Sequence, residues 1–358
     1  KFIMGTCLVT KLKGSISDSS LKKVGEMRIK FGVSETVNKQ TRGISMMFSR
    51  DVKLEIIGNG YFTDETITEN KGKTYSATAW GNGHIVYISN DSIELSISDK
   101  YSIVSISTYD GYKNQWSVFN PKEISFDIED LRYSSSLESL KLRGTSAYGD
   151  LSSLANNTSL KYIDLQDTSI KGDIANLNNN ANMTHLFLTG KDFYGDIASL
   201  LNKSNLEYLA INSPNVYGNI SSLSTSVKLV SLNLISTNIS GDFTSLKNCS
   251  KMTDISAERL SGDLAIMPAK LVYANLRYGK FSWSDRPSTS KIIAITSWSK
   301  STNIDKMLQD QANCVVGFTS SSDVTRKTIS VIGDRTSASD SALQTLQSKG
   351  YTVSISPK

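Results

Sequence analysis

The sequence predicts a chain of three parts: a sandwich-like all-β domain, a solenoid of short repeats and an α/β C-terminal cap. The solenoid follows from a phrase of Gly, then Asp or Asn, then an apolar residue, which returns along the middle of the chain. Its glycines stand at 149, 172, 195, 218, 241 and 262, so the steps are 23, 23, 23, 23 and 21 residues. A fixed period of this length is typical of stacked supersecondary units. Apolar and polar residues alternate before this region, and helix-capping signals follow it.

A second phrase, apolar-x-x-apolar-x-apolar, recurs with the glycine phrase between residues 137 and 276. Clear copies are Leu160/Ile163/Leu165, Met183/Leu186/Leu188, Leu206/Leu209/Ile211 and Leu229/Leu232/Leu234. Alternating apolar residues place their side chains on one face of a short strand. One strand cannot bury that face alone, so neighbouring units are expected to stack and share a core.

The Gly-Asp pair within each repeat has a local structural explanation. Glycine supplies a backbone position without a Cβ, and the Asp is expected to cap the short helical turn that follows it. A row of calcium ligands would be another use of such an Asp column. Capping explains every copy, and Asn219 caps equally well, so we assign no metal site.

Residues 1–108 contain no repeat phrase and are expected to form a separate β-rich anchoring domain. Stretches such as 27–33 and 93–97 alternate apolar and polar residues, as half-buried strands do. Gly-Asn-Gly at 58–60 and at 81–83 predicts two hairpin turns. These features favour a β-sandwich.

Residues 109–136 are expected to form the N-terminal cap of the solenoid and a degenerate first repeat. Asp127 stands 23 residues before Asp150, and the residues around it repeat the apolar spacing. Terminal repeats are expected to be atypical because they cover the exposed end of the core. The regular repeats then fill residues 137–276.

Residues 277–358 are expected to hold the last repeats and the α/β cap. Thr302 and Asp305 stand at capping-box spacing and predict a helix start. A second helix is expected from Ser337 to Lys349, ended by Gly350, with strands near 292–295, 328–332 and 351–355.

The composition excludes several classes of protein. The net charge of +5 is mild and both signs are interspersed, which is not the footprint of a nucleic-acid-binding protein. No stretch is long and apolar enough for membrane insertion. Cys7, Cys249 and Cys314 are too few and too far apart for a disulfide framework, so we expect small buried apolar residues. We interpret residues 1–9 as a first strand and not as a leader.

The sequence holds no convincing catalytic constellation. His84 and His185 are the only histidines and stand in different regions, and no glycine-rich phosphate loop ends in Lys-Ser or Lys-Thr. We therefore expect no catalytic residue, no cofactor and no enzyme activity, although the many carboxylates leave an acid pair open.

The residues between the apolar positions of each strand are the candidate binding residues, because they point away from the core. They place the aromatic side chains of Tyr162, His185, Phe187 and Tyr208 in one patch on the inner sheet, and Tyr273 is a further candidate in the same column, beyond Ser231 and Asp254. A second exposed column precedes the glycines and holds Tyr148, Lys171, Tyr194 and Tyr217. Rows of exposed aromatic residues suit stacking on sugars or burial against a protein. Ordinary cross-strand packing of half-buried tyrosines explains them equally well.

The two repeat phrases resemble those of leucine-rich repeat proteins of the 23-residue Gly-Asp-Ile type. Thr145, Thr168 and Thr237 stand where many such families place Asn, as in repeat proteins of Bacteroidetes and of their crAss-like tailed phages. The opening 7–13 and the ending 327–353 resemble phage-borne members.

The resemblance implies a non-enzymatic structural protein of the phage virion, such as a head fibre, a decoration or a tail-associated protein. The N-terminal domain would dock on capsid or tail proteins at the particle surface. The solenoid would be displayed for host attachment by binding a host surface protein or glycan. The alternative is a leucine-rich repeat adhesin or glycan-binding protein of the bacterial cell surface. The sequence leaves a homo-oligomer open.

Overall fold

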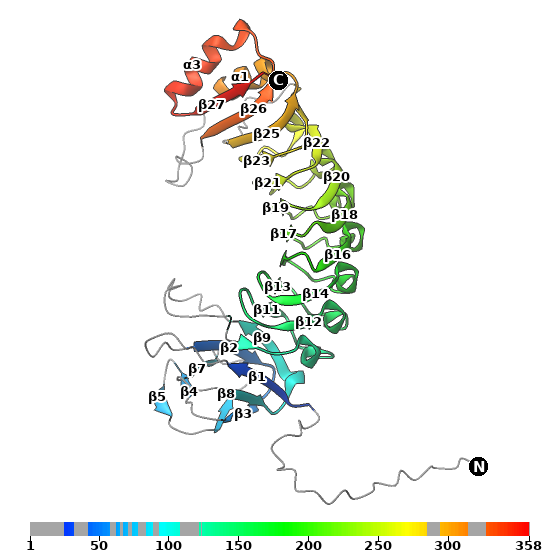
Figure 1. Ribbon diagram of the computed structural model, residues 1–358, viewed down its shortest axis with the longest axis vertical. Coiled ribbons are helices and arrows are strands. Elements are labelled where there is room, and N and C mark those ends of the chain that lie inside the picture. Colours follow the sequence, from blue (N-terminus) through cyan, green and yellow to red (C-terminus); the bar gives the residue numbers. More distant parts are fainter. Residues whose placement is uncertain are drawn as a thin grey trace, which may run out of the picture.

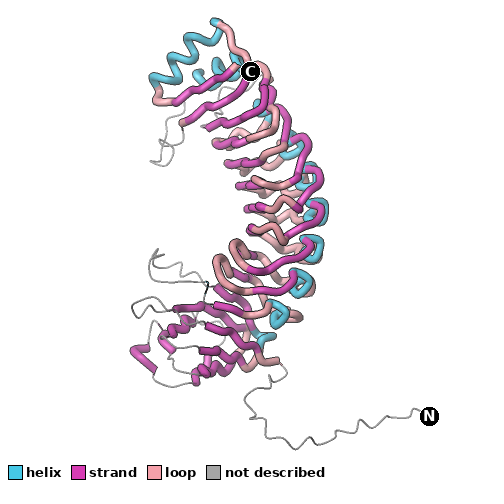
Figure 2. The backbone as a smooth tube through the Cα atoms, viewed as in Figure 1, coloured by secondary structure: helices cyan, strands magenta, loops and turns pink. Residues whose placement is uncertain are grey.

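The computed structural model is a curved solenoid with a β-rich region at one end and two helices at the other (Figure 1). The structure describes residues 25–31, 42–57, 62–64, 67–70, 74–77, 84–88, 93–107, 122, 124–284, 294–313 and 327–357. Each regular repeat contributes one strand to the inner side of the curve, one strand to a second sheet and one short 3₁₀-helix to the outer side (Figure 2).

The inner side of the curve is a 13-stranded sheet, which we call the concave sheet. Its central strands are parallel, and each pairs with the strand one repeat further along the chain. They are β11 (Ser139–Lys141), β13 (Tyr162–Asp164), β15 (His185–Thr189), β17 (Tyr208–Asn212), β19 (Ser231–Leu234), β21 (Asp254–Ala257) and β23 (Tyr273–Leu276). Residues that are equivalent in the repeat therefore lie side by side across the sheet.

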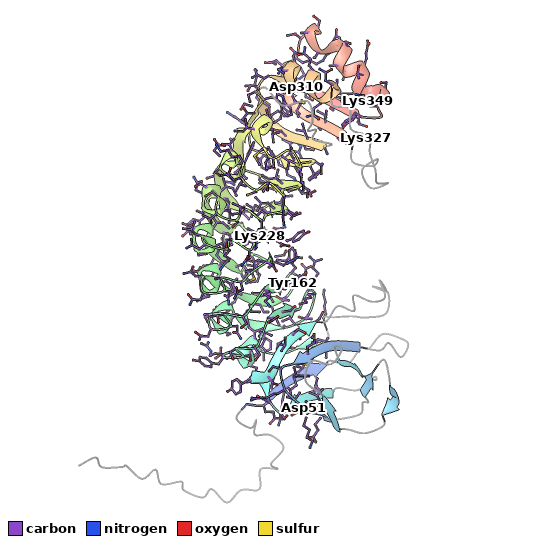
Figure 3. The ribbon with its side chains drawn as sticks, turned by 180° about the vertical axis from the view of Figure 1, so that it is seen from behind. Asp51, Tyr162, Lys228, Asp310, Lys327 and Lys349 are labelled. Carbon is purple, nitrogen blue, oxygen red and sulfur yellow. The ribbon has the colours of Figure 1, made fainter. Side chains whose placement is uncertain are left out.

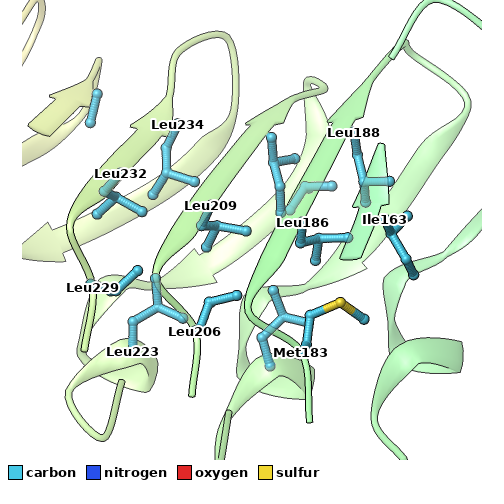
Figure 4. Close-up of a cluster of buried hydrophobic side chains, with 14 of the residues drawn as sticks. Ile163, Met183, Leu186, Leu188, Leu206, Leu209, Leu223, Leu229, Leu232 and Leu234 are labelled. Atoms are coloured by element: carbon cyan, nitrogen blue, oxygen red, sulfur yellow. The ribbon is translucent and has the colours of Figure 1, made fainter. Parts of the chain in front are cut away.

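The apolar positions of these strands form one continuous core. Leu186 lies opposite Ile163 on one side and Leu209 on the other, and all three are buried. Met183 and Leu206 extend the same layer below them (Figure 4). The shared core expected from the apolar phrase is present because each side chain fills the space between its two neighbouring copies.

The Gly-Asp phrases form a second parallel sheet that the sequence analysis did not foresee. Its strands are β12 (Tyr148–Asp150), β14 (Ser169–Asp173), β16 (Phe193–Asp196), β18 (Asn215–Asn219), β20 (Asn238–Asp242), β22 (Leu260–Asp263) and β24 (Phe281–Ser282). A 3₁₀-helix follows each of the first six strands, as at Ile197–Leu200. The expected cap is present in every one of these turns: Asp196 Oδ1, for example, accepts a hydrogen bond from the Ala198 N–H at 2.8 Å.

The glycine of this phrase is required by the neighbouring repeat. Gly195 has φ +120°, and a Cβ at this position would lie well inside van der Waals contact with Asp173 Oδ1. Gly218 has the same relation to Asp196, and Gly241 to Asn219. The capping carboxylate of one repeat therefore occupies the space that a side chain of the next repeat would need.

The concave sheet continues into the N-terminal region. Strand β9 (Ile103–Ser107) pairs in parallel with β11 and antiparallel with β2 (Arg42–Phe48), and β7 (His84–Ile88) closes this end. The first repeat strand would otherwise expose a row of unpaired N–H and C=O groups. The sheet thus crosses residue 108, where the sequence analysis expected a separate domain to end.

A second N-terminal sheet is antiparallel and has the order β10-β1-β8-β3-β6. Its strands are β10 (Ile124–Ser125), β1 (Met27–Phe31), β8 (Ile93–Ile97), β3 (Val52–Ile57) and β6 (Thr74–Ala77). Strand β10 comes from beyond residue 108, so this sheet also combines both sides of the expected boundary. A small hairpin of β4 (Phe62–Asp64) and β5 (Ile67–Asn70) contacts β7 of the concave sheet. The two expected Gly-Asn-Gly turns lie outside the described residues.

The C-terminal segment adds three more parallel strands to the concave sheet. They are β25 (Ala294–Ser301), β26 (Thr328–Gly333) and β27 (Thr352–Ser356). Helices α1 (Ile304–Asn313) and α3 (Asp340–Ser348) pack against each other, and a 3₁₀-helix (Ser337–Ser339) precedes α3. The expected capping box is wrong in one respect, because Asp305 accepts hydrogen bonds from Thr336 and Ser339 instead of serving residue 302.

A row of buried polar side chains follows the 3₁₀-helices at one position of the repeat. Each donates to the backbone carbonyl of the residue 23 positions earlier, and the row consists of Asn157, Asn180, Lys203, Ser226 and Cys249. Cys249 is buried, as expected, while Cys7 and Cys314 lie outside the described residues. Lys203 is only 1% exposed, and its Nζ donates to the carbonyls of Leu177, Asn178 and Asn180.

Lys203 is expected to be replaceable by asparagine but not by alanine. Asn157 and Asn180 show that an amide at this position reaches the preceding carbonyls. Lys203→Asn should therefore retain or raise stability at pH 7, whereas Lys203→Ala leaves buried acceptors unpaired and should cost about 2 kcal/mol or more. Urea denaturation of the three proteins measures the difference, and equal losses for both variants would contradict it.

The stability of the native protein should also depend on the charge of Lys203. Burial lowers the pKa of this amine to about 8 from its ordinary value of 10.5. Between these pH values the unfolded chain binds more protons than the folded one, so unfolding becomes less favourable as pH rises. The advantage of Lys203→Asn should be largest below pH 8 and shrink towards pH 10.5.

Candidate binding surface on the concave sheet

The outward side chains of the concave sheet form straight columns because the repeats pair in register. Ser139, Tyr162, His185, Tyr208 and Ser231 lie on successive strands. Tyr162 lies on the inner side of the curve (Figure 3). The outward aromatic residues of β13, β15 and β17 therefore lie side by side on this face.

Three rings of this column form a continuous stack, which we call the aromatic ladder (Tyr162, His185 and Tyr208). The centroids of Tyr162 and His185 are 4.7 Å apart, those of His185 and Tyr208 are 4.6 Å apart, and both pairs are tilted by 20°. Phe187 flanks the ladder, with its centroid 5.7 Å from Tyr162 and 6.1 Å from His185. The ring faces of His185 are covered on both sides.

Polar groups beside the ladder mostly pair with one another. The Lys141 ammonium lies 4.4 Å from the centroid of the Tyr162 ring, and Arg143 Nε is 3.4 Å from Asp164 Oδ2. Gln166 Nε2 donates to Thr189 Oγ1 at 2.9 Å. The rim of the patch beside Tyr162 therefore carries the positive charges of Lys141 and Arg143. The polar side chains here contact other side chains of the sheet.

Burial shifts the titration of the ladder. It lowers the pKa of His185, an effect that Glu207 opposes and Lys141 reinforces, so the imidazole is neutral at pH 7. It raises the pKa of Tyr162 and of Asp164, and Arg143 partly offsets the rise at Asp164. The ladder is thus an uncharged aromatic strip beside a basic rim.

The ladder leaves particular groups for a partner. Stacking covers ring faces and leaves ring edges and the two tyrosine hydroxyls, which have no hydrogen-bond partner among the described residues. Ring edges carry partial positive charge and favour carbonyl and carboxylate oxygens. These groups suit the polar surface of a protein better than the C–H face of a sugar.

The remaining candidates do not join the ladder. Tyr273 lies three strands beyond Tyr208, or about 14 Å at the usual strand spacing. Ser231 and Asp254 occupy the column between them, so Tyr273 lies apart from the patch of Tyr162, His185, Phe187 and Tyr208.

The second column lies on the other sheet. Tyr148, Tyr194 and Tyr217 are 47%, 49% and 52% exposed on β12, β16 and β18, and Lys171 is exposed on β14. The two columns are therefore separate surfaces and do not form one site.

No family model and no curated protein matches this chain. Among solved structures, it is similar to internalin C2 from Listeria monocytogenes, with 20% identity over 52% of this chain and 76% of that one, and a TM-score of 0.38. A complex of PEPR1 with AtPEP1 gives 16% identity over 72% of this chain and 35% of that one, with a TM-score of 0.49. A leucine-rich repeat protein from Leptospira interrogans is 13% identical over 63% of this chain and 62% of that one, with a TM-score of 0.33.

The deciding observation lies in this chain itself: each regular repeat adds one short parallel strand to the concave sheet, with the apolar phrase buried and the 3₁₀-helices outside. The fold is a leucine-rich repeat solenoid. None of the helices in the part of the chain that the structure describes has the length and apolar character to span a bilayer.

The leucine-rich repeat sheet carries one aromatic cluster that the sequence analysis missed. Tyr278 and Trp298 are 59% and 47% exposed, and their centroids are 5.6 Å apart at an interplanar angle of 77°. The Arg277 guanidinium carbon lies 5.2 Å from the centroid of the Trp298 ring. The strand before Trp298 departs from the repeat phrase, so no sequence signal placed the tryptophan beside Arg277.

Groups of His, Cys, Asp and Glu that would hold a metal ion are absent from the described residues. The carboxylates of the Asp column stand one to a repeat, except where Asn219 replaces Asp, and each caps its own turn.

Proposed function

We propose that the solenoid is a non-enzymatic binding scaffold whose concave sheet recognises a protein through the aromatic ladder. The ladder supports this proposal because it presents hydroxyls and ring edges from three adjacent repeats on one outward face. Tyrosine and arginine are enriched at the energetic centres of protein interfaces, and Arg143 is exposed at the rim of the patch. A partner with acidic groups would complement Lys141 and Arg143.

The location that we propose is the surface of a phage particle, with the N-terminal region docked on capsid or tail proteins. Support comes from the resemblance of the opening and ending segments to phage-borne repeat proteins. The solenoid would then project from the particle and bind a host surface protein, with many copies strengthening weak contacts. The alternative is an adhesin on the bacterial cell surface.

Replacing Tyr208 by alanine is expected to weaken binding to host cells at least about tenfold, because it removes one end of the ladder and a free hydroxyl. Labelled full-length protein and flow cytometry measure the change. Tyr217→Ala removes a tyrosine that is more exposed than Tyr208 from the other sheet and should have no effect. Equal binding by both variants would exclude the ladder as the contact.

Location is tested on purified particles. Mass spectrometry should find the chain in them, and full-length protein should rebind to particles from which it has been stripped. The full chain is needed because a cut at residue 108 would remove β10 from the N-terminal sheet and leave β9 without β11. Detection only in the cell envelope would favour the adhesin.

A further inference from the structure

A β-bulge presents Trp298 at the C-terminal end of the concave sheet. Strand β25 pairs with β26 in register up to Ser297 and resumes at Lys300, so Trp298 and Ser299 are extra residues in this ladder. Bulges of this kind change the direction of side chains and are over-represented beside functional sites. Trp298 stands four strands from Tyr208, or about 19 Å at the usual strand spacing.

The polar groups around Trp298 keep their hydrogen-bonding capacity. Arg277 Nη1 is 3.7 Å from Glu258 Oε1, which is an ion pair but longer than a hydrogen bond. Within the described residues, neither of these two side chains forms a hydrogen bond, and neither does the Tyr278 hydroxyl or the Trp298 indole N–H. The five guanidinium N–H groups of Arg277, which lies over the Trp298 ring, and the two carboxylate oxygens of its ion-pair partner Glu258 are therefore left without hydrogen bonds.

This arrangement is the opposite of that in the aromatic ladder. There, the rings cover one another, Arg143 pairs with Asp164, and the Gln166 amide donates to Thr189. At Trp298 the two rings meet nearly at a right angle and form a corner, with Arg277 over the indole. The corner leaves ring surface exposed at both residues.

We propose that Trp298, Tyr278, Arg277 and Glu258 form a binding site for a hexose unit of a neutral glycan. A pyranose ring has a face of C–H groups and a rim of hydroxyls. The C–H face packs on an exposed aromatic ring, while the hydroxyls exchange hydrogen bonds with the guanidinium and the carboxylate. The one cation and one carboxylate in contact balance each other, which favours an uncharged sugar over an acidic one. The site is distinct from the aromatic ladder and does not rest on the proposed protein contact.

Isothermal titration of the full-length protein tests this site. The probes are six-unit oligosaccharides of glucose, mannose, galactose and N-acetylglucosamine, with an oligogalacturonate as the acidic comparison. At least one neutral probe should bind, and Trp298→Ala should weaken it about tenfold or more. Trp298→Phe should retain most of the affinity because it keeps a ring. Tyr217→Ala, which alters the other sheet, should leave the affinity unchanged.

Each outcome decides the proposal. No binding of any neutral probe, tighter binding of the acidic one, or full binding by Trp298→Ala would overturn it. Circular dichroism melting of Trp298→Ala, an exposed position, separates loss of the site from loss of the fold. A failure here leaves the cell-binding test of Tyr208 untouched, because the two variants alter surfaces four strands apart.

Discussion

Replacing Leu186 by aspartate is expected to unfold the repeats. The side chain is fully buried between Ile163 and Leu209, so the carboxylate would have no water and no cation near it. Burying an unpaired charge in a core costs more than about 4 kcal/mol, which exceeds most single-residue effects. Because every repeat contacts only its neighbours, a break at β15 separates the array into two parts with new exposed ends.

Circular dichroism and urea denaturation measure this loss. The control is Asn233→Asp, which places the same carboxylate on the outward, exposed face of β19 and should melt like the native protein. An unchanged melting transition for Leu186→Asp would show that the core packing described above is wrong.

Gly195→Ala is expected to have the second largest effect, about 3 kcal/mol. An L-residue at φ +120° costs on the order of 1–3 kcal/mol. The added Cβ also displaces the Asp173 carboxylate, which caps its own turn through the Ala175 N–H at 2.8 Å, and loss of a cap costs about 1 kcal/mol. The substitution therefore destabilises the repeat that contains Gly195 and also the capped turn of the preceding repeat.

Gly190→Ala is the matched control for this prediction. Its φ of +140° imposes similar backbone strain, but a Cβ there would meet only Phe193 at 4.0 Å. Gly195→Ala should therefore lose about 1 kcal/mol more than Gly190→Ala in urea denaturation. Adding Asp173→Gly should remove that excess, and equal losses in both alanine variants would show that the carboxylate contact has no energetic role.

The repeat region was accessible from the sequence because its determinants are local and recur. Leu186 and its copies fix which face is buried, Asp196 caps a turn two residues away, and the 23-residue step fixes how far apart the copies stand. The aromatic ladder followed as well, since in-register pairing brings Tyr162, His185 and Tyr208 together. Regular periodicity thus carries three-dimensional information.

Contacts between segments that do not share the repeat phrase could not be predicted from the sequence. The pairing of β9 with β11 joins an antiparallel region to the repeats, and no phrase in the sequence marks it. Trp298 approaches Arg277 only because β25 pairs with β23 and then forms a bulge. Lys203 looks like a surface residue in the sequence and is buried because three carbonyls from the preceding repeat accept its ammonium.

The sequence by itself determined the solenoid, its buried face and the capped turns, because these depend on residue types at fixed short spacings. The tertiary structure alone decided which exposed residues meet. Whether a ring is covered by its neighbour, as in the ladder, or left open beside unused polar groups, as at Trp298, depends on the side chains of adjacent strands and on their register. Those relations are set by packing across the sheet and not by order along the chain.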